Sequence, residues 1–191
     1  MTSMRAVAIG LIAAIVVIGA WAHWPEPALP EHTQANWVVI RKDARRLELY
    51  RDEQLLKAYP VSLGRHPTGA KDRQGDGRTP EGEFRIDGRN PRSSFHKALH
   101  ISYPTASEVT LARSRGVDPG GLIMIHGIKN GLGWLGHLHR LIDWTDGCIA
   151  VTNREMDEIW LALMPGRRGA RYIQCRWPVG AEELRWNHPI G

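Results

Sequence analysis

The sequence predicts a mainly β domain of the α+β class, a sandwich or barrel capped by short helices, behind an apolar N-terminal segment. Many short segments rich in β-branched and aromatic residues alternate with turn residues. Beyond the N-terminus few stretches have helical character, and the sequence contains no internal repeat. With 191 residues, 42% of them apolar, the chain has room for one domain with its own core.

The N-terminal segment is typical of a sequence that meets a membrane. Residues 6–22 follow Arg5, carry no charge and consist almost entirely of Ala, Val, Ile, Leu and Gly. As a helix they span roughly 25 Å, slightly less than the ~30 Å hydrocarbon core of a bilayer. We therefore expect residues 1–22 to be a cleaved signal peptide or a membrane anchor, and the rest to lie in the periplasm or cell envelope. A buried core helix is the alternative, which the terminal position and the missing polar stripe disfavour.

The remaining chain divides by composition into a linker at 23–36, a domain at 37–178 and a C-terminal tail at 179–191. Three prolines predict the linker. Within the domain, strands are expected at 37–42, 46–51, 55–63, 83–88, 99–103, 122–126 and 172–177. The first three form an antiparallel meander.

Helices and one long loop complete the expected elements. Residues 107–115 predict a short helix, and residues 154–164 predict a second, introduced by Thr152 and Glu155 at the spacing of a capping box. Residues 64–82 are rich in Gly, Pro, Asp and Thr, which predicts a long surface loop of the kind that often carries function.

Charge and cysteine content restrict the function classes. The net charge of +5 comes from scattered pairs rather than a long basic block, which indicates solvated surface and argues against a nucleic-acid partner; the pairs are Arg41-Lys42, Arg45-Arg46 and Arg167-Arg168. The two cysteines, Cys148 and Cys175, allow one structural disulfide. Cys148, however, is surrounded by residues that favour a reactive thiol, whereas Cys175 lies in an alternating run typical of a strand.

His126 and Cys148 are the candidate catalytic residues. A thiol with a pKa of about 8.5 is a weak nucleophile at neutral pH unless a base lies beside it, and His126 ends an apolar strand where it can serve as that base. Gly147 allows a sharp turn before the thiol, so backbone amides at Asp146, Gly147 and Cys148 are candidates for an oxyanion pocket.

Each charged residue near the candidate catalytic pair has two interpretations. Asp143 and Asp146 either orient His126 or bind a substrate amine, or they accept local backbone hydrogen bonds. Lys71, Arg78 and Glu81 either contact substrate from the loop or are solvated loop charges.

These residues stand within a longer set of motifs. His126-Gly127 and the segment DWTDGCIA at 143–150 resemble the L,D-transpeptidase (YkuD) catalytic domain, in its proteobacterial branch. Further matching positions, in chain order, are Gly64, Pro67, Gly69, Lys71, Gly75-Asp76, the run TPEG at 79–82, Asn90-Pro91, the run ISYP at 101–104 and the run PGG at 119–121. The resemblance covers about residues 37–177.

The resemblance implies a YkuD-like β-sandwich and a cysteine thioester formed on the diamino-acid residue of a peptidoglycan tetrapeptide stem. Carried onto this chain, Cys148 is the nucleophile and His126 the proton acceptor and donor. Gly127, Thr145, Asp146 and Gly147 are expected to bind substrate or its oxyanion. No metal and no organic cofactor is implied, and the partners are peptidoglycan stem peptides.

Two departures from the commoner family pattern leave open which molecule accepts the acyl group from the cysteine. Thr145-Asp146 stands where Ser-His is usual before the Gly-Cys pair, and Ala150 stands where Arg is usual, which removes a bidentate carboxylate contact. An amine acceptor gives transpeptidation, and water gives carboxypeptidase or amidase activity, such as detaching an envelope lipoprotein from peptidoglycan.

Three hypotheses would place the protein in other functional classes. Residues 131–136 match the G-x-G-x-x-G pattern of dinucleotide sites, without a surrounding βαβ pattern. His126, His137, His139 and Cys148 are residue types that bind zinc, although His137 and His139 would diverge on a helix. A wall-binding module without catalysis is the third.

Overall fold

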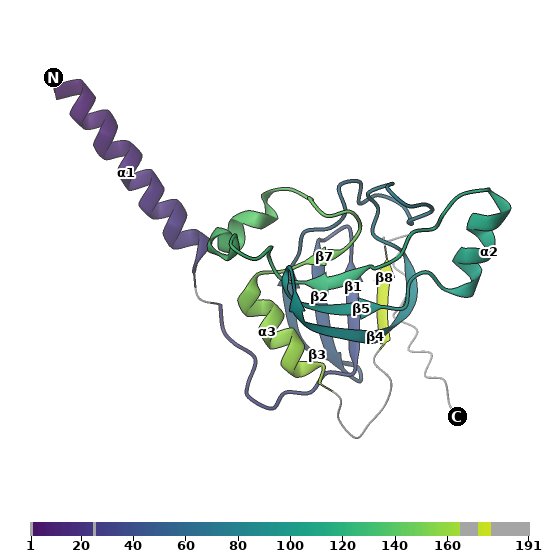
Figure 1. Cartoon of the computed structure of the whole chain (residues 1–191). Coiled ribbons are helices and arrows are strands. Elements are labelled where there is room, and N and C mark those ends of the chain that lie inside the picture. Colours follow the sequence, from purple (N-terminus) through teal and green to yellow (C-terminus); the bar gives the residue numbers. More distant parts are fainter. Residues whose placement is uncertain (1, 25, 165–171, 177–191) are drawn as a thin grey trace.

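The computed structural model describes residues 2–24, 26–164 and 172–176 as one α+β unit with a projecting N-terminal helix (Figure 1). The helices are α1 (Thr2–Ala22), α2 (Ala106–Ser114), the 3₁₀ helix η1 (Gly133–Leu141) and α3 (Asn153–Ala162). The strands are β1 (Trp37–Arg41), β2 (Arg46–Arg51), β3 (Gln54–Pro60), β4 (Gly82–Ser93), β5 (His96–Ile101), β6 (Met124–His126), β7 (Ile149–Ala150) and β8 (Tyr172–Arg176).

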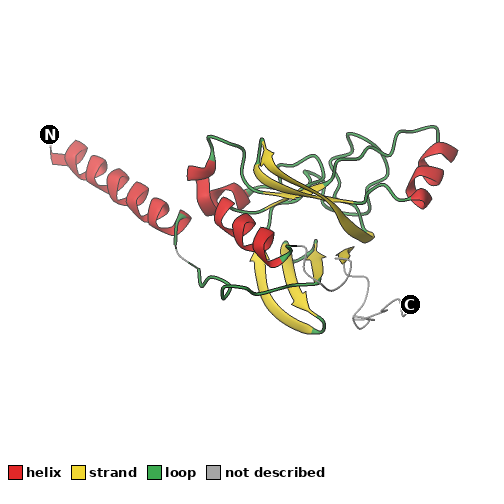
Figure 2. Ribbon diagram, turned by 60° about the horizontal axis from the view of Figure 1, so that its bottom comes forward, coloured by secondary structure: helices red, strands yellow, loops and turns green. Residues whose placement is uncertain are grey.

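The strands form one mixed sheet of eight in the order β3-β2-β1-β8-β4-β5-β6-β7. Strand β4 joins its two halves, because its first residues pair with β8 and its later residues pair with β5. Register shifts at Ile86/Gly88 and Asn90/Ser93 let β4 bend. Figure 2 shows the strands stacked in two layers, as expected when a long strand passes from one layer to the other.

The core lies between the two halves of the sheet and α3. Val38, Ile40 and Leu47 contribute from one half, and Ile125 and Ile149 from the other, each with 0% exposure. Helix α3 adds Met156 and Ile159 from one face at i and i+3. Its N-terminus has the predicted capping box, in which the Thr152 hydroxyl accepts from the Glu155 amide and the Glu155 carboxylate binds the Thr152 amide.

The predicted α+β class is confirmed, as are the antiparallel meander of β1, β2 and β3 and both helices of the domain. The expected strand over 55–63 ends at Pro60. Residues 61–63 leave the strand, and Ser62 bridges Ala150. The sequence did not predict η1 or the two-residue β7. Trp177, the rest of the domain to 178, the pair Arg167-Arg168 and the tail 179–191 lie outside the described residues.

Helix α1 agrees with the expected membrane segment. Met4–Ala22 is long and apolar enough to cross a membrane, and its side chains are exposed as far as Trp21. A signal sequence has the same length and composition, so this agreement fits both expectations. Only its C-terminal end touches the domain: Ala22 is buried, and the Trp21 ring lies 6.2 Å from that of His137 in η1.

One charge prediction is wrong. Lys42, interpreted from sequence as part of a solvated basic pair, has 0% exposure. Its ammonium group donates to the carbonyls of Gly69 and Thr79 at 2.7 and 2.8 Å and to Glu81 at 2.8 Å. These contacts satisfy a buried charge and fasten the loop over 64–82 to the end of β1.

Candidate active site

The parallel pairing of β6 with β7 brings His126 and Cys148 into one neighbourhood. Ile125 pairs with Ile149 and His126 with Ala150. Side chains alternate along a strand, so the two isoleucines point into the core while His126 and Ala150 share the other face. Cys148 precedes Ile149, and carrying the register back one residue puts its side chain on the His126 face, opposite Met124.

His126 is buried, and its ring is held on one side. Its Nδ1 lies 2.6 Å from the carbonyl oxygen of Gly127, and because a carbonyl only accepts, Nδ1 carries the hydrogen. The neutral ring therefore leaves Nε2 as the acceptor. Burial lowers the pKa of His126, and the Gly127 carbonyl opposes this shift only in part. A neutral imidazole with a free Nε2 is the form that a general base needs.

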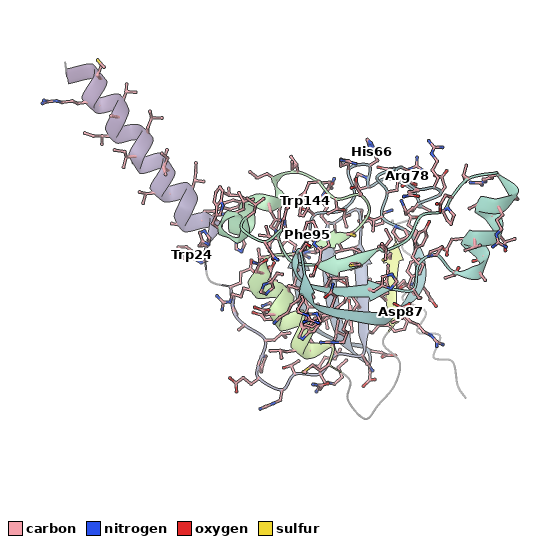
Figure 3. All side chains as sticks on the ribbon, viewed as in Figure 1. Trp24, His66, Arg78, Asp87, Phe95 and Trp144 are labelled. Carbon is pink, nitrogen blue, oxygen red and sulfur yellow. The ribbon has the colours of Figure 1, made fainter. Side chains whose placement is uncertain are left out.

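Aromatic rings enclose that imidazole. The rings of Phe95 and Trp144 lie 4.7 and 5.8 Å from the His126 ring between centroids. Phe95 and Trp144 also stack on each other at 6.1 Å, and Figure 3 shows them close together beside the sheet. The rings exclude water from one side of the imidazole, which accounts for the direction of its pKa shift.

Cys148 is half-buried, and its surroundings favour the protonated thiol. Burial raises the pKa of Cys148, the Met124 backbone amide opposes the shift, and the Asp146 carboxylate adds to it. The thiol points toward the Leu122 carbonyl at 3.6 Å. Within the described residues no hydrogen bond joins the thiol to His126. The resting pair is thus a neutral thiol with a neutral imidazole, and proton transfer has to accompany attack on a substrate.

The turn before Cys148 is held by Thr145. Its hydroxyl donates to the carbonyl of Cys148 at 2.7 Å and accepts from the amide of Gly147 at 3.2 Å. Gly147 has a φ of +127°, and a Cβ there would lie 2.5 Å from the Arg78 carbonyl oxygen. Only glycine fits this position. The amide of Cys148 has no backbone acceptor within the described part of the chain, so it is free to bind a developing oxyanion.

The loop over 64–82 packs directly against this turn. The amide of Arg65 donates to the Thr145 carbonyl at 3.0 Å, and a Cβ on Gly64 would lie 3.1 Å from the Gly147 Cα. Lys71 and Asp76 form a buried ion pair at 2.7 Å inside the loop, with side-chain exposures of 3% and 5%. Lys71 and Glu81 therefore serve as internal anchors. Arg78 is half-buried and donates to the Ala70 carbonyl at 3.3 Å, whereas His66 is exposed at the edge of the loop (Figure 3).

Neither aspartate reaches His126. Asp143 accepts from the Leu63 amide at 2.9 Å and pairs with Arg45, which agrees with the local-acceptor interpretation. Asp146 is largely exposed and pairs with Arg65. The group that orients His126 is instead the carbonyl of Gly127, a backbone atom that side-chain patterns do not reveal.

The alternative interpretations of cysteine, zinc and glycine residues do not match the structure. Cys148 and Cys175 are both free, with Cys175 buried in β8, so the structural disulfide is wrong. Of the four candidate zinc residues, His137 lies beside Glu26 and Glu155, while His139 contacts Ser62. The glycine motif at 131–136 runs into η1 and not into a βαβ helix, which agrees with the sequence argument against a dinucleotide site.

Sequence reasoning missed Phe95 and Lys42. Phe95 lies in a turn between β4 and β5, far from the motif in sequence, and no periodicity marks it. Lys42 had a usable signal, since it continues the alternation of the buried residues Val38 and Ile40 on one face of a strand.

Comparison with known proteins agrees with this geometry. A family model described as L,D-transpeptidase catalytic domain (YkuD) matches residues 35–173. A curated relative, "Putative L,D-transpeptidase YafK" of Escherichia coli (strain K12), is 33% identical over 131 residues, which cover 65% of this chain and 45% of the relative. The chain thus spans less than half the length of that relative.

Two solved structures share the fold at low identity. The helical cell shape determining protein Pgp2 from Campylobacter jejuni has a TM-score of 0.56 and 20% identity, covering 84% of this chain and 54% of that one. Bd1075 of Bdellovibrio bacteriovorus has a TM-score of 0.50 and 20% identity, covering 77% of this chain and 49% of that one. The resemblance predicted from sequence is confirmed: the chain belongs to the family of YkuD L,D-transpeptidase catalytic domains.

Proposed function

We propose that this protein is a cysteine-dependent L,D-transpeptidase that acts on tetrapeptide stems of peptidoglycan in the cell envelope. Cys148 Sγ attacks the carbonyl carbon of the diamino-acid residue while its proton passes to His126 Nε2. The carbon–nitrogen bond to the terminal D-Ala then breaks, and His126 returns the proton to the departing amine. The product is a thioester on Cys148, which an amine from a second stem resolves.

The observation that carries this proposal is a buried His126 whose Nδ1 is held by the Gly127 carbonyl, on a strand that pairs with the strand directly after Cys148. Membership of the transpeptidase family supports the reaction class. The free amide of Cys148 is the natural donor to the oxyanion, with Thr145 shaping the turn and Gly147 giving access. Asp146 and Gly127 complete the proposed substrate-binding residues. Asp146 lies at the solvent side of the site, and Gly127 lies behind His126.

The parts of the chain have separate roles in this proposal. Residues 1–22 direct the protein to the membrane or anchor it there, and residues 23–36 are the linker to the domain. Residues 37–178 form the catalytic domain, and residues 179–191 are the C-terminal tail. Helix α1 and the family membership support a location in the envelope.

The acceptor determines the outcome of the reaction. Ala150 is fully buried in β7 and offers no cation to a substrate carboxylate. An amine acceptor cross-links stems, whereas water would shorten them or free an attached lipoprotein.

The full chain in detergent, incubated with purified tetrapeptide stems and followed by intact-mass analysis, tests the mechanism. We expect a mass increase equal to the stem minus D-Ala in wild type and in Cys175→Ala, and no adduct in Cys148→Ala. His126→Asn should lower the acylation rate by roughly 10²–10⁴-fold. An adduct that persists in Cys148→Ala contradicts the proposal, and unreacted wild type that still binds sacculi supports a non-catalytic wall-binding module.

Muropeptide analysis of treated sacculi then identifies the acceptor. New dimers linked between diamino-acid residues indicate an amine, and shortened stems or released lipoprotein indicate water. The Cys148→Ala variant should leave the muropeptide profile unchanged in either case.

A further inference from the structure

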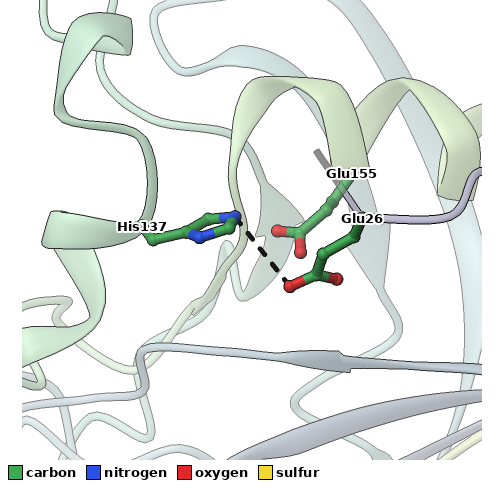
Figure 4. A group of neighbouring side chains, drawn as sticks. All are labelled: Glu26, His137 and Glu155. Atoms are coloured by element: carbon green, nitrogen blue, oxygen red, sulfur yellow. Dashed lines mark ion pairs between the residues drawn. The ribbon is translucent and has the colours of Figure 1, made fainter. Parts of the chain in front are cut away.

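We propose that Glu26, His137 and Glu155 form a divalent transition-metal site suited to Zn²⁺, which ties the segment after α1 to the domain. The three residues come from the linker, from η1 and from the first turn of α3. One ligand atom from each lies within 4.8 Å of the others, and the side chains converge in Figure 4.

Glu155 supplies the observation that points to a ligand. The residue is 5% exposed, and one carboxylate oxygen, Oε2, accepts from the amide and hydroxyl of Thr152 at 2.9 and 2.8 Å and pairs with Arg140. The other oxygen, Oε1, is buried without a hydrogen-bond partner in the described part of the chain. Native proteins rarely leave a buried carboxylate oxygen without a donor or a cation, because the lost solvation is costly.

The same carboxylate faces the other two ligands. Figure 4 shows it directed toward the His137 ring and the carboxylate of Glu26. Arg140 already balances the charge of Glu155 through Oε2, so Oε1 is the atom left for an ion. The capping box of α3 thereby holds one ligand rigidly, as a structural metal site requires.

The spacing of the remaining pair suits an ion better than a direct contact. His137 Nε2 and Glu26 Oε1 lie 3.9 Å apart, which is too long for a hydrogen bond. Around tetrahedral zinc, with bonds of about 2.0–2.2 Å, neighbouring ligand atoms are about 3.4 Å apart. Rotation of the Glu26 side chain, which is 38% exposed, closes that difference.

The ligand types select the metal. One imidazole and two carboxylates are common zinc ligands and leave a fourth position for water, while Mg²⁺ prefers an all-oxygen shell. The group borders a cavity of about 250 Å³ lined by Trp24, Lys57 and Asn153, which gives room for that water.

The ion would add a link among three segments that the Arg140–Glu155 ion pair and the bond from Arg154 to the Glu26 carbonyl already bring together. It would fix Glu26, four residues after the end of α1, onto η1 and α3. Helix η1 also carries His139, whose ring lies 6.4 Å from that of Trp144 beside His126. Metal binding therefore sets where the linker leaves the domain, and stabilises the helix that borders the candidate active site.

Zinc binding by the full chain in detergent tests this site. All proteins carry Cys148→Ser, which removes the reactive thiol as a competing ligand. After addition of ZnCl₂ and desalting, metal analysis should find one zinc per chain, and calorimetry should give binding at least tenfold weaker in Glu26→Gln and in His137→Gln. MgCl₂ should not compete. Glu26 lies on the linker, so its variant keeps the fold.

His96→Gln is the matched control, because His96 Nε2 also pairs with a carboxylate, that of Asp157 at 2.7 Å, outside the cluster. It should bind zinc like the Cys148→Ser parent. Limited proteolysis gives a second readout: zinc should slow cleavage between residues 23 and 36 in the parent and in His96→Gln, but not in Glu26→Gln. Sub-stoichiometric zinc in the parent, or equal binding in the His137→Gln and His96→Gln proteins, overturns the proposal.

Discussion

At the scale of single residues, burial holds both catalytic candidates in their neutral forms. The pKa of His126 lies below its ordinary value of about 6.5 because the ring is desolvated, and the pKa of Cys148 lies above that of a free thiol for the same reason. The imidazole is therefore available as a base in mildly acidic solution, and the thiol remains protonated at neutral pH. Cysteine enzymes with a resident thiolate–imidazolium pair show the reverse pattern.

The first prediction concerns pH. Alkylation of Cys148 by iodoacetamide, followed by intact mass in Cys175→Ala, should keep rising above pH 8.5 because the thiol pKa is raised. Acylation by stem peptide should hold its rate from pH 7 down to about 6.5, since the lowered pKa keeps His126 neutral there. An alkylation rate that is already constant below pH 7 would reveal a thiolate and contradict this description.

The second prediction concerns Thr145, whose hydroxyl bridges the Cys148 carbonyl and the Gly147 amide. Thr145→Val keeps the shape and removes both hydrogen bonds, so we expect a loss of about 1–3 kcal/mol in unfolding free energy. Acylation should slow roughly tenfold because the turn loosens. Urea unfolding and acylation kinetics measure the two effects. Thr145→Ser keeps the hydroxyl and should be close to wild type, and a Val variant with wild-type kinetics would show that the turn needs no such bridge.

At the scale of elements, the loop over 64–82 is more ordered than its composition indicates. Lys42 fastens it from β1, Lys71 and Asp76 pair inside it, and its backbone contacts the turn that carries Cys148. The loop thus behaves as part of the scaffold for the nucleophile. A glycine-rich composition predicted its irregular path, but only the tertiary contacts of two buried lysines determine its rigidity.

The third prediction follows from the Lys71–Asp76 pair. Burial alone would raise the pKa of Asp76, but Lys71 and the amides of Arg78, Asp72 and Arg73 bind the carboxylate and hold its pKa far below the ordinary value. A depressed carboxyl pKa contributes stability that is complete above the unfolded value of about 3.9 and is lost as the pH falls below it. Asp76→Asn should therefore be about 3 kcal/mol less stable at pH 7, because Lys71 stays buried without its partner.

Urea unfolding between pH 7 and pH 3 checks this prediction. The difference between wild type and Asp76→Asn should narrow as the pH falls below 4. Asp72→Asn is the control, since Asp72 is 38% exposed and lies 4.0 Å from Arg115. It should change stability by less than about 1 kcal/mol at any pH. If the difference in unfolding free energy between wild type and Asp76→Asn did not depend on pH, the ion pair would not be the source of the stability.

At the scale of the whole molecule, α1 and the domain are nearly independent. The core residues run from Ala35 to Cys175, and α1 contributes to the domain mainly through Trp21 and Ala22. The two parts differ in burial: α1 is an apolar helix whose side chains are exposed from Met4 to Trp21, and the domain has a closed core. Folding of the domain therefore requires little from the segment before it.

The fourth prediction removes residues 1–21. The truncated chain should be soluble without detergent, unfold within a few degrees of the full chain, and acylate stems at a similar rate. Vesicle flotation of the full chain and the truncated chain should show membrane partitioning in the first alone. A truncated chain that fails to fold would show that α1 is a structural part of the domain.

The amino-acid sequence by itself determined the class of fold, most of the strands and helices, and the identity of the family. Alternation of apolar residues and turn chemistry are local properties, and the motif around Cys148 is contiguous in the chain. Tertiary structure alone decided which partners the two buried lysines have, that a backbone carbonyl orients His126, and that His137 lies beside Glu26 and Glu155. These depend on segments distant in sequence meeting in space, because burial and the partners of a charge are properties of the packed molecule.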